Sequence, residues 1–131
     1  MALVKICPTK NSLKYIGKKW TLEIIRDLFF GKTRFSEFLQ ENPGITKKIL
    51  SERLKELEEE NFITRKVISE SPKNIAYHLT EKGYRLNKIL YELSLLSIDY
   101  YKDDIFTDLN NPQNEELMIS YSKQYFQIND D

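Results

Sequence analysis

The sequence predicts a mainly α-helical chain with a small β-hairpin wing (α+β), arranged as a winged helix-turn-helix with a long C-terminal dimerisation helix. Apolar residues recur at helical spacing through residues 11–60, and a short Gly-containing turn at 42–44 separates two of the expected helices. After Asn61 the apolar period becomes that of strands, and helical spacing returns at 81–101. Helices, a helix-turn-helix and a two-stranded ribbon, in this order, predict a winged helix.

Length and composition limit the class of protein. A chain of 131 residues suffices for one compact domain with a modest core. It has no apolar run long enough to cross a bilayer, no secretory leader and one cysteine, so we expect a reducing, cytoplasmic setting and no membrane partner. No phosphate loop, His/Cys cluster or paired-carboxylate motif occurs, and the only histidine, His78, lacks catalytic partners. We therefore expect no enzyme activity, no metal and no cofactor.

The net charge of zero hides an asymmetry along the chain. Residues 1–102 carry 19 Lys/Arg against 13 Asp/Glu, whereas residues 103–131 carry one against seven. A basic body is typical of proteins that bind a polyanion, although a solvated surface explains the same charge. We expect a winged-helix DNA-binding domain at 1–102, including the N-terminal and long C-terminal dimerisation helices. The acidic extension at 103–131 is expected not to contact DNA, because phosphates repel it.

Two helices are expected at the start of the chain. The first covers residues 11–17 and the second covers residues 19–30, after which Gly31 acts as a stop. The second helix has a broad apolar face that includes Trp20. We therefore assign Trp20 to the core rather than to a platform for a ligand.

A third helix is expected at residues 34–41. Thr33 is its predicted N-cap, and Glu37 lies where its carboxylate can interact with the helix start. Backbone N–H groups at Thr33 and Arg34 are candidates to hold a phosphate, as at other helix N-termini. A salt bridge between Arg34 and Glu37 is an equally good explanation of the arginine.

The fourth helix, within residues 44–65 (GITKKILSERLKELEEENFITR), carries its charges in an unusual order. Lys47 and Lys48 occupy the first turn and Glu58–Glu60 occupy the last, opposite to the order that the helix dipole favours. A recognition helix explains this order, because its first turn points at phosphates and base edges in the major groove.

The same helix also has an ordinary explanation. Thr46 is its predicted cap, and three leucines with i, i+4, i+7 spacing are predicted to face the core: Leu50, Leu54 and Leu57. A solvated helix with this core face is also stable if i,i+4 ion pairs outweigh the dipole. The available pairs are Lys48–Glu52 and Lys55–Glu59. The expected wing and the basic body favour DNA.

A β-hairpin is expected after Asn61, with strands at 63–70 and 75–79 and a basic, polar turn at 71–74. In the second strand one face carries Ile75, Tyr77 and Leu79, and the other carries Ala76 and His78.

Helical structure is expected again after the hairpin. Thr80 caps a predicted helix at 81–101, which has two apolar stripes. One stripe is expected to pack on the body of the domain and the other on a second copy of the chain. Residues 103–113 are predicted to form a loop, and residues 115–126 a short helix whose apolar side packs on the body or on the partner subunit.

The candidate DNA contacts are polar and basic residues at helix starts, on the accessible face of the fourth helix and at the wing tip: Thr33, Arg34, Thr46, Lys47, Lys48, Ser51, Arg53, Lys55, Lys73 and Asn74. We assign Lys47 and Lys48 mainly to phosphates, and Ser51 with Lys48 or Arg53 to base edges. Lys73 and Asn74 are candidates for the minor groove or the backbone.

Several segments together resemble the HxlR-type winged-helix transcriptional regulators. CPTKNSLKYIGKKW is similar to the opening of that family, GKTRFSEF to its Gly-x-x-Arg-Phe-x-Glu-Leu segment, and IAYHLTEKG to the end of its wing. Residues 44–65 resemble its recognition helix. The resemblance implies a homodimeric DNA-binding regulator without catalytic activity. The sequence departs from the family pattern at Lys18, Asn74 and Ala76. Because Asn74 stands where an Arg is common at the wing, we expect weaker or shifted wing contacts.

The resemblance also draws attention to Cys7, which stands where some relatives carry a cysteine used as a thiol switch. Lys5, Lys10 and the nearby helix start favour a thiolate. The alternative is a partly buried, inert thiol.

Two functions of different classes are consistent with these patterns. The first is a transcriptional regulator that binds an inverted-repeat operator as a homodimer, with thiol or small-molecule sensing as an open extension. The second is a winged-helix module that binds another protein through the same surface.

Overall fold

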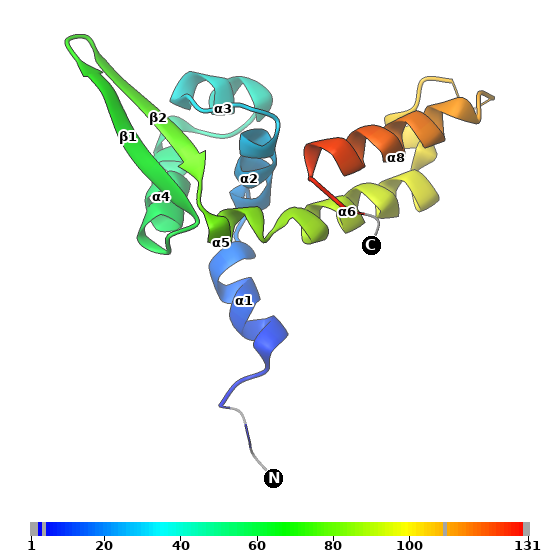
Figure 1. Cartoon of the computed structure of the whole chain (residues 1–131), viewed down its shortest axis with the longest axis horizontal. Helices are drawn as coiled ribbons and strands as arrows, with labels where there is room; N and C mark the ends of the chain where they lie inside the picture. Colours follow the sequence, from blue (N-terminus) through cyan, green and yellow to red (C-terminus); the bar gives the residue numbers. More distant parts are fainter. Residues whose placement is uncertain (1–2, 4, 109, 130–131) are drawn as a thin grey trace. The chain divides into compact units, whose positions relative to one another are not determined.

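The computed structural model describes residues 3, 5–108 and 110–129. The elements follow in the order α1 (Pro8–Ile16), α2 (Thr21–Phe29), α3 (Phe35–Glu41), α4 (Lys47–Glu59), β1 (Ile63–Glu70), β2 (Lys73–Leu79), α5 (Glu81–Tyr84), α6 (Asn87–Tyr100), α7 (Lys102–Ile105) and α8 (Gln113–Tyr125) (Figure 1). The predicted class, mainly helical with a two-stranded hairpin in a winged helix-turn-helix, is confirmed.

The chain packs as two compact units, one ending at Gly83 and one starting at Tyr84. The first holds α1–α4 and the hairpin, and the second holds α6, α7 and α8. These units describe packing within the chain, and the functional division expected at residue 102 stays a prediction.

The core of the first unit is built from the apolar faces of α2, α3 and α4. Ile24 and Ile25 of α2 and Phe38 of α3 are fully buried. The three leucines of α4 are buried as predicted, with side chains at most 2% exposed: Leu50, Leu54 and Leu57. Burying one such side chain contributes about 1.5–3 kcal/mol, so this face fixes which side of α4 turns outward.

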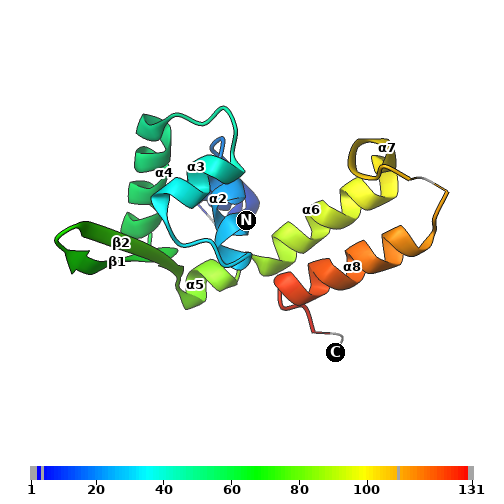
Figure 2. The same ribbon diagram turned by 90° about the horizontal axis from the view of Figure 1, so that it is seen from above.

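The wing consists of β1 and β2, an antiparallel pair with Ile63 opposite Leu79. Both views show it as a two-stranded ribbon that extends beyond the helices of its unit (Figures 1 and 2). The backbone N–H of Tyr77 donates to the carbonyl oxygen of Thr33 at 2.9 Å, and the rings of Phe38 and Tyr77 meet edge to face. The wing is therefore attached to the segment that starts α3.

Two helix starts differ from the sequence prediction. α1 begins at Pro8 rather than at residue 11, because proline has a helical φ and its missing N–H is not needed at the first helical position. α2 begins at Thr21, because Trp20 has a φ of 80° in the left-handed region and cannot continue a helix. Trp20 is half-buried rather than fully in the core. Gly31 ends α2 as predicted, with a φ of 86°.

The single helix predicted at 81–101 is wrong, because the chain forms α5 and α6 with a break at residues 85–86. The predicted cap is present, since Thr80 Oγ1 accepts from Gly83 N at 3.1 Å. Glycine lowers helix stability by about 1 kcal/mol relative to alanine, which favours a break near Gly83. A side chain at Gly83 would collide with the carbonyl oxygen of Phe62, so the close packing of α5 requires this glycine.

The second unit is a helical hairpin in which α8 lies antiparallel beside α6 (Figures 1 and 2). Asn87 Nδ2 donates to the carbonyl oxygen of Phe126 at 2.9 Å, and Lys102 pairs with Glu115 at 2.7 Å. Part of the loop expected at 103–113 is helical, since α7 covers Lys102–Ile105.

The predicted helix at 115–126 is present as α8, and packing of its apolar side on a partner subunit stays a prediction. Within the chain Phe126 and Ser122 are buried, whereas four other apolar or aromatic residues of α8 are exposed: Leu117, Met118, Tyr121 and Tyr125. The apolar spacing alone does not show which flank of a short helix meets its neighbour. Across residues 3, 5–108 and 110–129, the structure has no helix long and apolar enough to span a membrane.

Candidate nucleic-acid interface

The start of α4 is capped by a neutral side chain only. Thr46 Oγ1 accepts from Ile49 N at 3.1 Å, as the sequence predicts. The first turn contains no acidic residue, and Lys47 and Lys48 are both exposed. The partial positive charge of the helix start and two lysines therefore point into solvent together.

The outward face of α4 continues this polar surface. Ser51 and Lys55 are exposed and lie on the side opposite the three buried leucines, together with Lys48 and the carboxylate of Glu52. Within the part of the chain that the structure describes, neither Lys48–Glu52 nor Lys55–Glu59 forms an ion pair. The ion pairs proposed as an ordinary explanation of the helix are thus absent.

Arg53 differs from the other candidates on α4, because its side chain is only 14% exposed. Its Nε donates to the carbonyl oxygen of Lys19 at 2.9 Å, and its Nη1 bonds Glu56 Oε1 at 2.8 Å. Of the two side chains considered with Ser51 for base edges, Lys48 is accessible and Arg53 is engaged within the protein.

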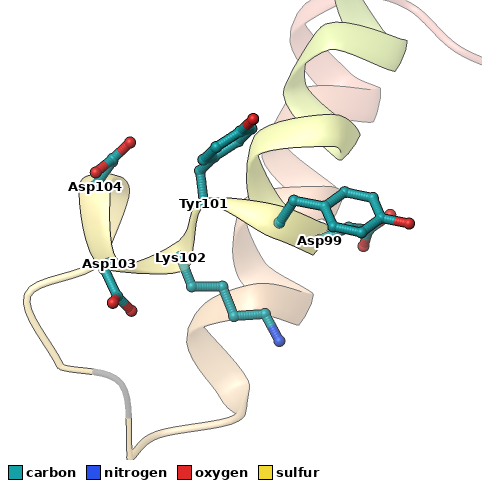
Figure 3. Close-up of a pocket in the computed structure, with 6 residues that line it drawn as sticks. Asp99, Tyr101, Lys102, Asp103 and Asp104 are labelled. Atoms are coloured by element: carbon teal, nitrogen blue, oxygen red, sulfur yellow. The ribbon is translucent and has the colours of Figure 1, made fainter.

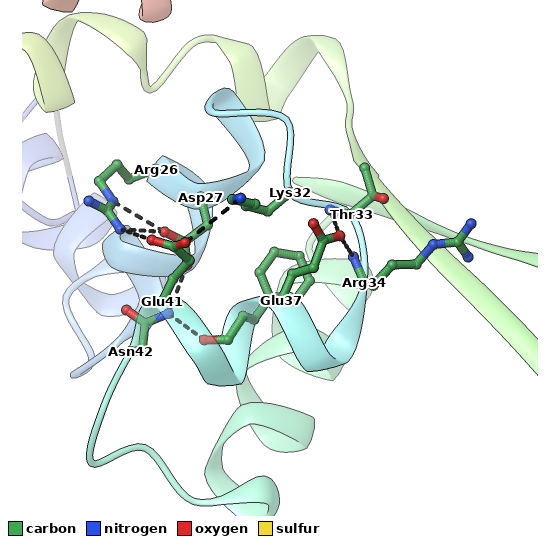
Figure 4. Close-up of polar contacts among 9 residues, drawn as sticks. Arg26, Asp27, Lys32, Thr33, Arg34, Glu37, Glu41 and Asn42 are labelled. Carbon is green, nitrogen blue, oxygen red and sulfur yellow. Dashed lines mark hydrogen bonds and ion pairs between the residues drawn. The ribbon is translucent and has the colours of Figure 1, made fainter.

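The start of α3 is closed by its own carboxylate. Glu37 Oε1 accepts from Thr33 N at 3.2 Å and from Arg34 N at 3.1 Å, so the predicted interaction of Glu37 with the helix start is present (Figure 4). The N-cap is Arg34 in extended conformation, rather than Thr33. The N–H groups that were candidates for a phosphate are therefore occupied by an internal anion.

The side chain of Arg34 turns away from Glu37 and toward the wing (Figure 4). Its Nη1 donates to Asn74 Oδ1 at 2.5 Å, 40 residues further along the chain. The salt bridge to Glu37 considered for Arg34 is not formed. The structure instead brings two candidate contacts together, one from the start of α3 and one from the wing.

The wing also carries exposed cations outside the set chosen from the sequence. Lys73, a chosen candidate, lies opposite Glu70 at the tip and is exposed. Arg65 and Lys66 of β1 are exposed as well, because only the first residue of that strand is buried. Alternation along the strand did not single them out, since both faces of β1 contact solvent.

The far end of α3 is fixed by a buried polar cluster. Asn42 Nδ2 donates to Asp27 Oδ2 at 2.7 Å and to the carbonyl oxygen of Phe38 at 2.8 Å (Figure 4). Arg26 Nη2 lies 2.6 Å from Asp27 Oδ1. Burial raises the pKa of Asp27, and the hydrogen bonds from Arg26 and Asn42 oppose that rise. The cluster connects α2 to the turn of the helix-turn-helix. Sequence reasoning did not identify Asp27, although an acidic residue within an otherwise apolar helix is a signal for such a buried polar contact.

Cys7 is exposed and is the N-cap residue of α1, although its side chain makes no capping hydrogen bond. The backbone N–H groups of Lys10 and Thr9 favour the thiolate and lower the pKa of Cys7 below its usual value. The alternative of a partly buried, inert thiol is wrong about burial, and the reactivity of Cys7 stays a prediction.

A cavity of about 350 Å³ lies in the second unit where α6 meets α7, and it is lined by Asp99, Tyr100, Tyr101, Lys102, Asp103 and Asp104 (Figure 3). The ammonium of Lys102 is paired with the carboxylate of Glu115, and this pairing raises the pKa of Lys102. Three carboxylates would repel a phosphate, so this cavity is no candidate for nucleic acid. In the described ranges no group of His, Cys, Asp and Glu side chains could hold a metal ion.

Comparison with known proteins places this geometry in a family. Residues 15–104 match the model of the HxlR-like helix-turn-helix family. The chain is 39% identical over 105 residues to the HTH-type transcriptional regulator YvaP of Bacillus subtilis. The matched region covers 79% of this chain and 96% of YvaP. It is 40% identical over 89 residues to the HTH-type transcriptional regulator YodB of the same organism, covering 67% and 80%.

Solved structures give the same result. Reduced YodB from B. subtilis superposes with a TM-score of 0.62 at 35% identity, over 75% of this chain and 97% of YodB. YodB is also known in diamide-treated and quinone-bound forms. The redox regulator HypR, in its oxidised form, superposes with a TM-score of 0.67 at 33% identity, over 71% of this chain and 96% of HypR. These relatives are transcriptional regulators, not enzymes, and their helix-turn-helix implies DNA as a partner. The chain belongs to the HxlR-like helix-turn-helix family of transcriptional regulators.

Proposed function

We propose that the protein binds a specific inverted-repeat operator as a homodimer, with α4 in the major groove. The observation that carries this proposal is the outward face of α4, where four polar or basic side chains surround a helix start without an acid: Lys47, Lys48, Ser51 and Lys55. A phosphate offsets the unfavourable position of these lysines in the free protein.

The accessible candidates divide into positioning and reading contacts. Lys47 and Lys48 neutralise phosphates, while Ser51, together with Lys48, faces base edges. Thr46 borders this face at the helix start, and Lys55, toward the other end, neutralises a further phosphate. At the wing, Lys73 contacts the backbone or minor groove. Arg34 contacts a phosphate through its side chain, whose position is fixed by the hydrogen bond to Asn74. The backbone N–H groups at the start of α3 do not make this contact, because Glu37 already accepts from them.

The homodimer rests on an exposed apolar stripe of α6. Its members follow i, i+4, i+7, i+11 spacing and are between 42% and 77% exposed: Ile89, Leu93, Leu96 and Tyr100. Leu13 of α1 is likewise exposed. A second copy that covers these side chains gives a two-fold dimer, whose half-sites lie about one helical turn, roughly 34 Å, apart. Sedimentation of Leu93→Glu should then show a monomer at a concentration where the wild type is a dimer.

The operator assignment is tested by a salt titration. The double variant Lys47→Ala/Lys48→Ala should weaken binding to every duplex, and it should flatten the slope of log K against log salt by about 0.9 for each lost phosphate contact. Affinity and slope equal to those of the wild type on a bound genomic fragment would contradict the proposal. In that case the winged-helix protein-interaction module becomes the better explanation of the same surface.

Thiol sensing is a second candidate function, favoured by the exposure of Cys7 and the lowered pKa of its thiol. In a dimer, two Cys7 thiols lose two electrons and two protons to an oxidant such as diamide, and one disulfide forms between the subunits. This bond requires the two Cα atoms to lie within about 7 Å. Diamide should change operator affinity in the wild type and not in Cys7→Ser, whereas an equal response of both proteins would exclude this role.

A further inference from the structure

The linker between α1 and α2, residues 17–20, is held by contacts with α4 and with the turn that precedes it. Trp20 ends it with a φ of 80°, a conformation that a bulky residue keeps only when its surroundings enforce it. One such support is a hydrogen bond from α4, because Arg53 Nε donates to the carbonyl oxygen of Lys19 at 2.9 Å. The linker therefore contacts the recognition helix directly, 34 residues further along the chain.

Glu56 completes this connection. Its Oε1 accepts from Arg53 Nη1 at 2.8 Å, and its Oε2 lies 3.2 Å from Lys18 Nζ. One carboxylate thus holds a cation of the linker and a cation of α4. We call Lys18, Lys19, Arg53 and Glu56 the linker clamp.

The linker also reaches the turn that precedes α4. A Cβ added at Gly44, which has a φ of +98°, would lie 4.0 Å from Trp20 Cη2, so the indole lies beside this turn. The ammonium of Lys19 lies 5.1 Å from the centre of the same ring. The linker therefore contacts α4 through the clamp and the preceding turn through Trp20.

We propose that Arg53 is a positioning residue for DNA binding, which fixes the orientation of α4 through the linker clamp and contacts neither bases nor phosphates. The proposal rests on the proposed function, since the orientation of α4 affects operator binding only if α4 reads DNA. Two geometric facts support it. The guanidinium of Arg53 is directed to two internal acceptors, and its charge is paired with Glu56 in a side chain that is 14% exposed.

The test compares Arg53→Ala with Lys55→Ala, which removes the same charge from the exposed face of the same helix. Trp20 is the only tryptophan, so its emission reports on the clamp without a label. Arg53→Ala should shift this emission in the free protein and weaken operator binding by about tenfold or more, with the salt slope unchanged. Lys55→Ala should leave the emission unchanged and reduce the salt slope by about 0.9.

A conservative variant separates positioning from contact. A lysine at position 53 can contact a phosphate in place of the arginine. It lacks, however, the planar guanidinium that bonds the Lys19 carbonyl and Glu56 together. Arg53→Lys should therefore fail to restore affinity. Rescue by Arg53→Lys, or a slope reduced by about 0.9 with unchanged emission in Arg53→Ala, would make Arg53 a DNA contact and overturn the proposal. A shifted emission with unchanged affinity would overturn it as well.

Glu56→Gln provides a test if Arg53→Ala does not fold. This change removes a negative charge from a helix that faces a polyanion, so general electrostatics predicts tighter binding. The clamp predicts weaker operator binding, because the pair with Lys18 is lost. Tighter binding would overturn the proposal. If the wild type binds no DNA, the proposed function fails, while an unchanged Trp20 emission in the free Arg53 and Glu56 variants separately rejects the clamp.

Discussion

The two helices of the helix-turn-helix begin in opposite ways. At the start of α3, Glu37 accepts from the N–H groups of Thr33 and Arg34, so an internal carboxylate satisfies the positive helix end. At the start of α4, the Thr46 hydroxyl is the cap and Lys47 follows directly. The carboxylate of Glu37 thus stabilises the start of α3 within the protein. The first turn of α4 has no acidic residue, and the proposed phosphate contacts rest on this difference.

The other ends of the two helices complete this difference. α3 ends on Asn42, whose side chain bonds the Phe38 carbonyl and the buried Asp27. α4 ends in a run of glutamates, an unfavourable position that Lys82 offsets by donating to the carbonyl oxygen of Glu60 at 2.7 Å. α3 is thus stabilised at both ends within the protein, whereas α4 is stabilised at its C-terminal end and left cationic at its N-terminal end.

The largest effect is expected from reversing the charges at the start of α4. Lys47→Glu/Lys48→Glu places two acids where the helix dipole favours them, so the free protein should gain about 0.3–1 kcal/mol per site in free energy of unfolding. The same acids repel phosphates, and operator binding should fall by more than about a hundredfold. Denaturant unfolding and fluorescence anisotropy measure the two quantities. A variant that loses both stability and binding would show that the lysines serve the fold.

Sequence patterns predicted the features of α3 and α4 that depend on residues close together in the chain. The spacing of Leu50, Leu54 and Leu57 fixes which face of α4 is exposed, and Thr46 and Glu37 act within one helical turn of their own positions. Such contacts follow from helix geometry alone.

Contacts between distant parts of the chain were not predictable in this way. Arg53 bonds a carbonyl 34 residues away and Arg34 bonds an amide 40 residues away, and no periodicity encodes either partner. The left-handed Trp20 and the break after α5 likewise depend on tertiary packing. The bonds from Arg53 to Lys19 and from Arg34 to Asn74 are therefore both absent from the sequence-based expectations, which for Arg34 name only DNA or Glu37.

A smaller effect is expected from opening the start of α3. Glu37→Ala removes the acceptor of two backbone N–H groups and should lower the free energy of unfolding by about 1–2 kcal/mol. The freed N–H groups can then donate to a phosphate oxygen, so the salt slope of DNA binding should steepen by up to about 0.9. Glu52→Ala, which removes an exposed carboxylate of α4, is the control for stability and should change it by less than about 0.5 kcal/mol. Equal stability losses in both variants would mean that Glu37 is not a cap.

The smallest effect concerns the far end of α3 and its dependence on pH. Burial raises the pKa of Asp27 more than the hydrogen bonds from Arg26 and Asn42 lower it. A group whose pKa is raised by folding binds its proton more tightly in the native state, so acidification stabilises the fold through this group. The gain begins as pH falls through the raised pKa and is complete below the unfolded value of about 3.9.

Asp27→Asn isolates this contribution, because asparagine does not titrate and all other carboxylates remain. The free energy of unfolding of the wild type minus that of Asp27→Asn should be constant near neutral pH and should rise as the pH falls toward 4. Urea unfolding at a series of pH values measures the difference. If the difference falls instead, the hydrogen bonds from Arg26 and Asn42 outweigh burial and hold the pKa of Asp27 below its usual value. Asp27 would then act as a stabilising anion at the end of α3, as Glu37 does at its start.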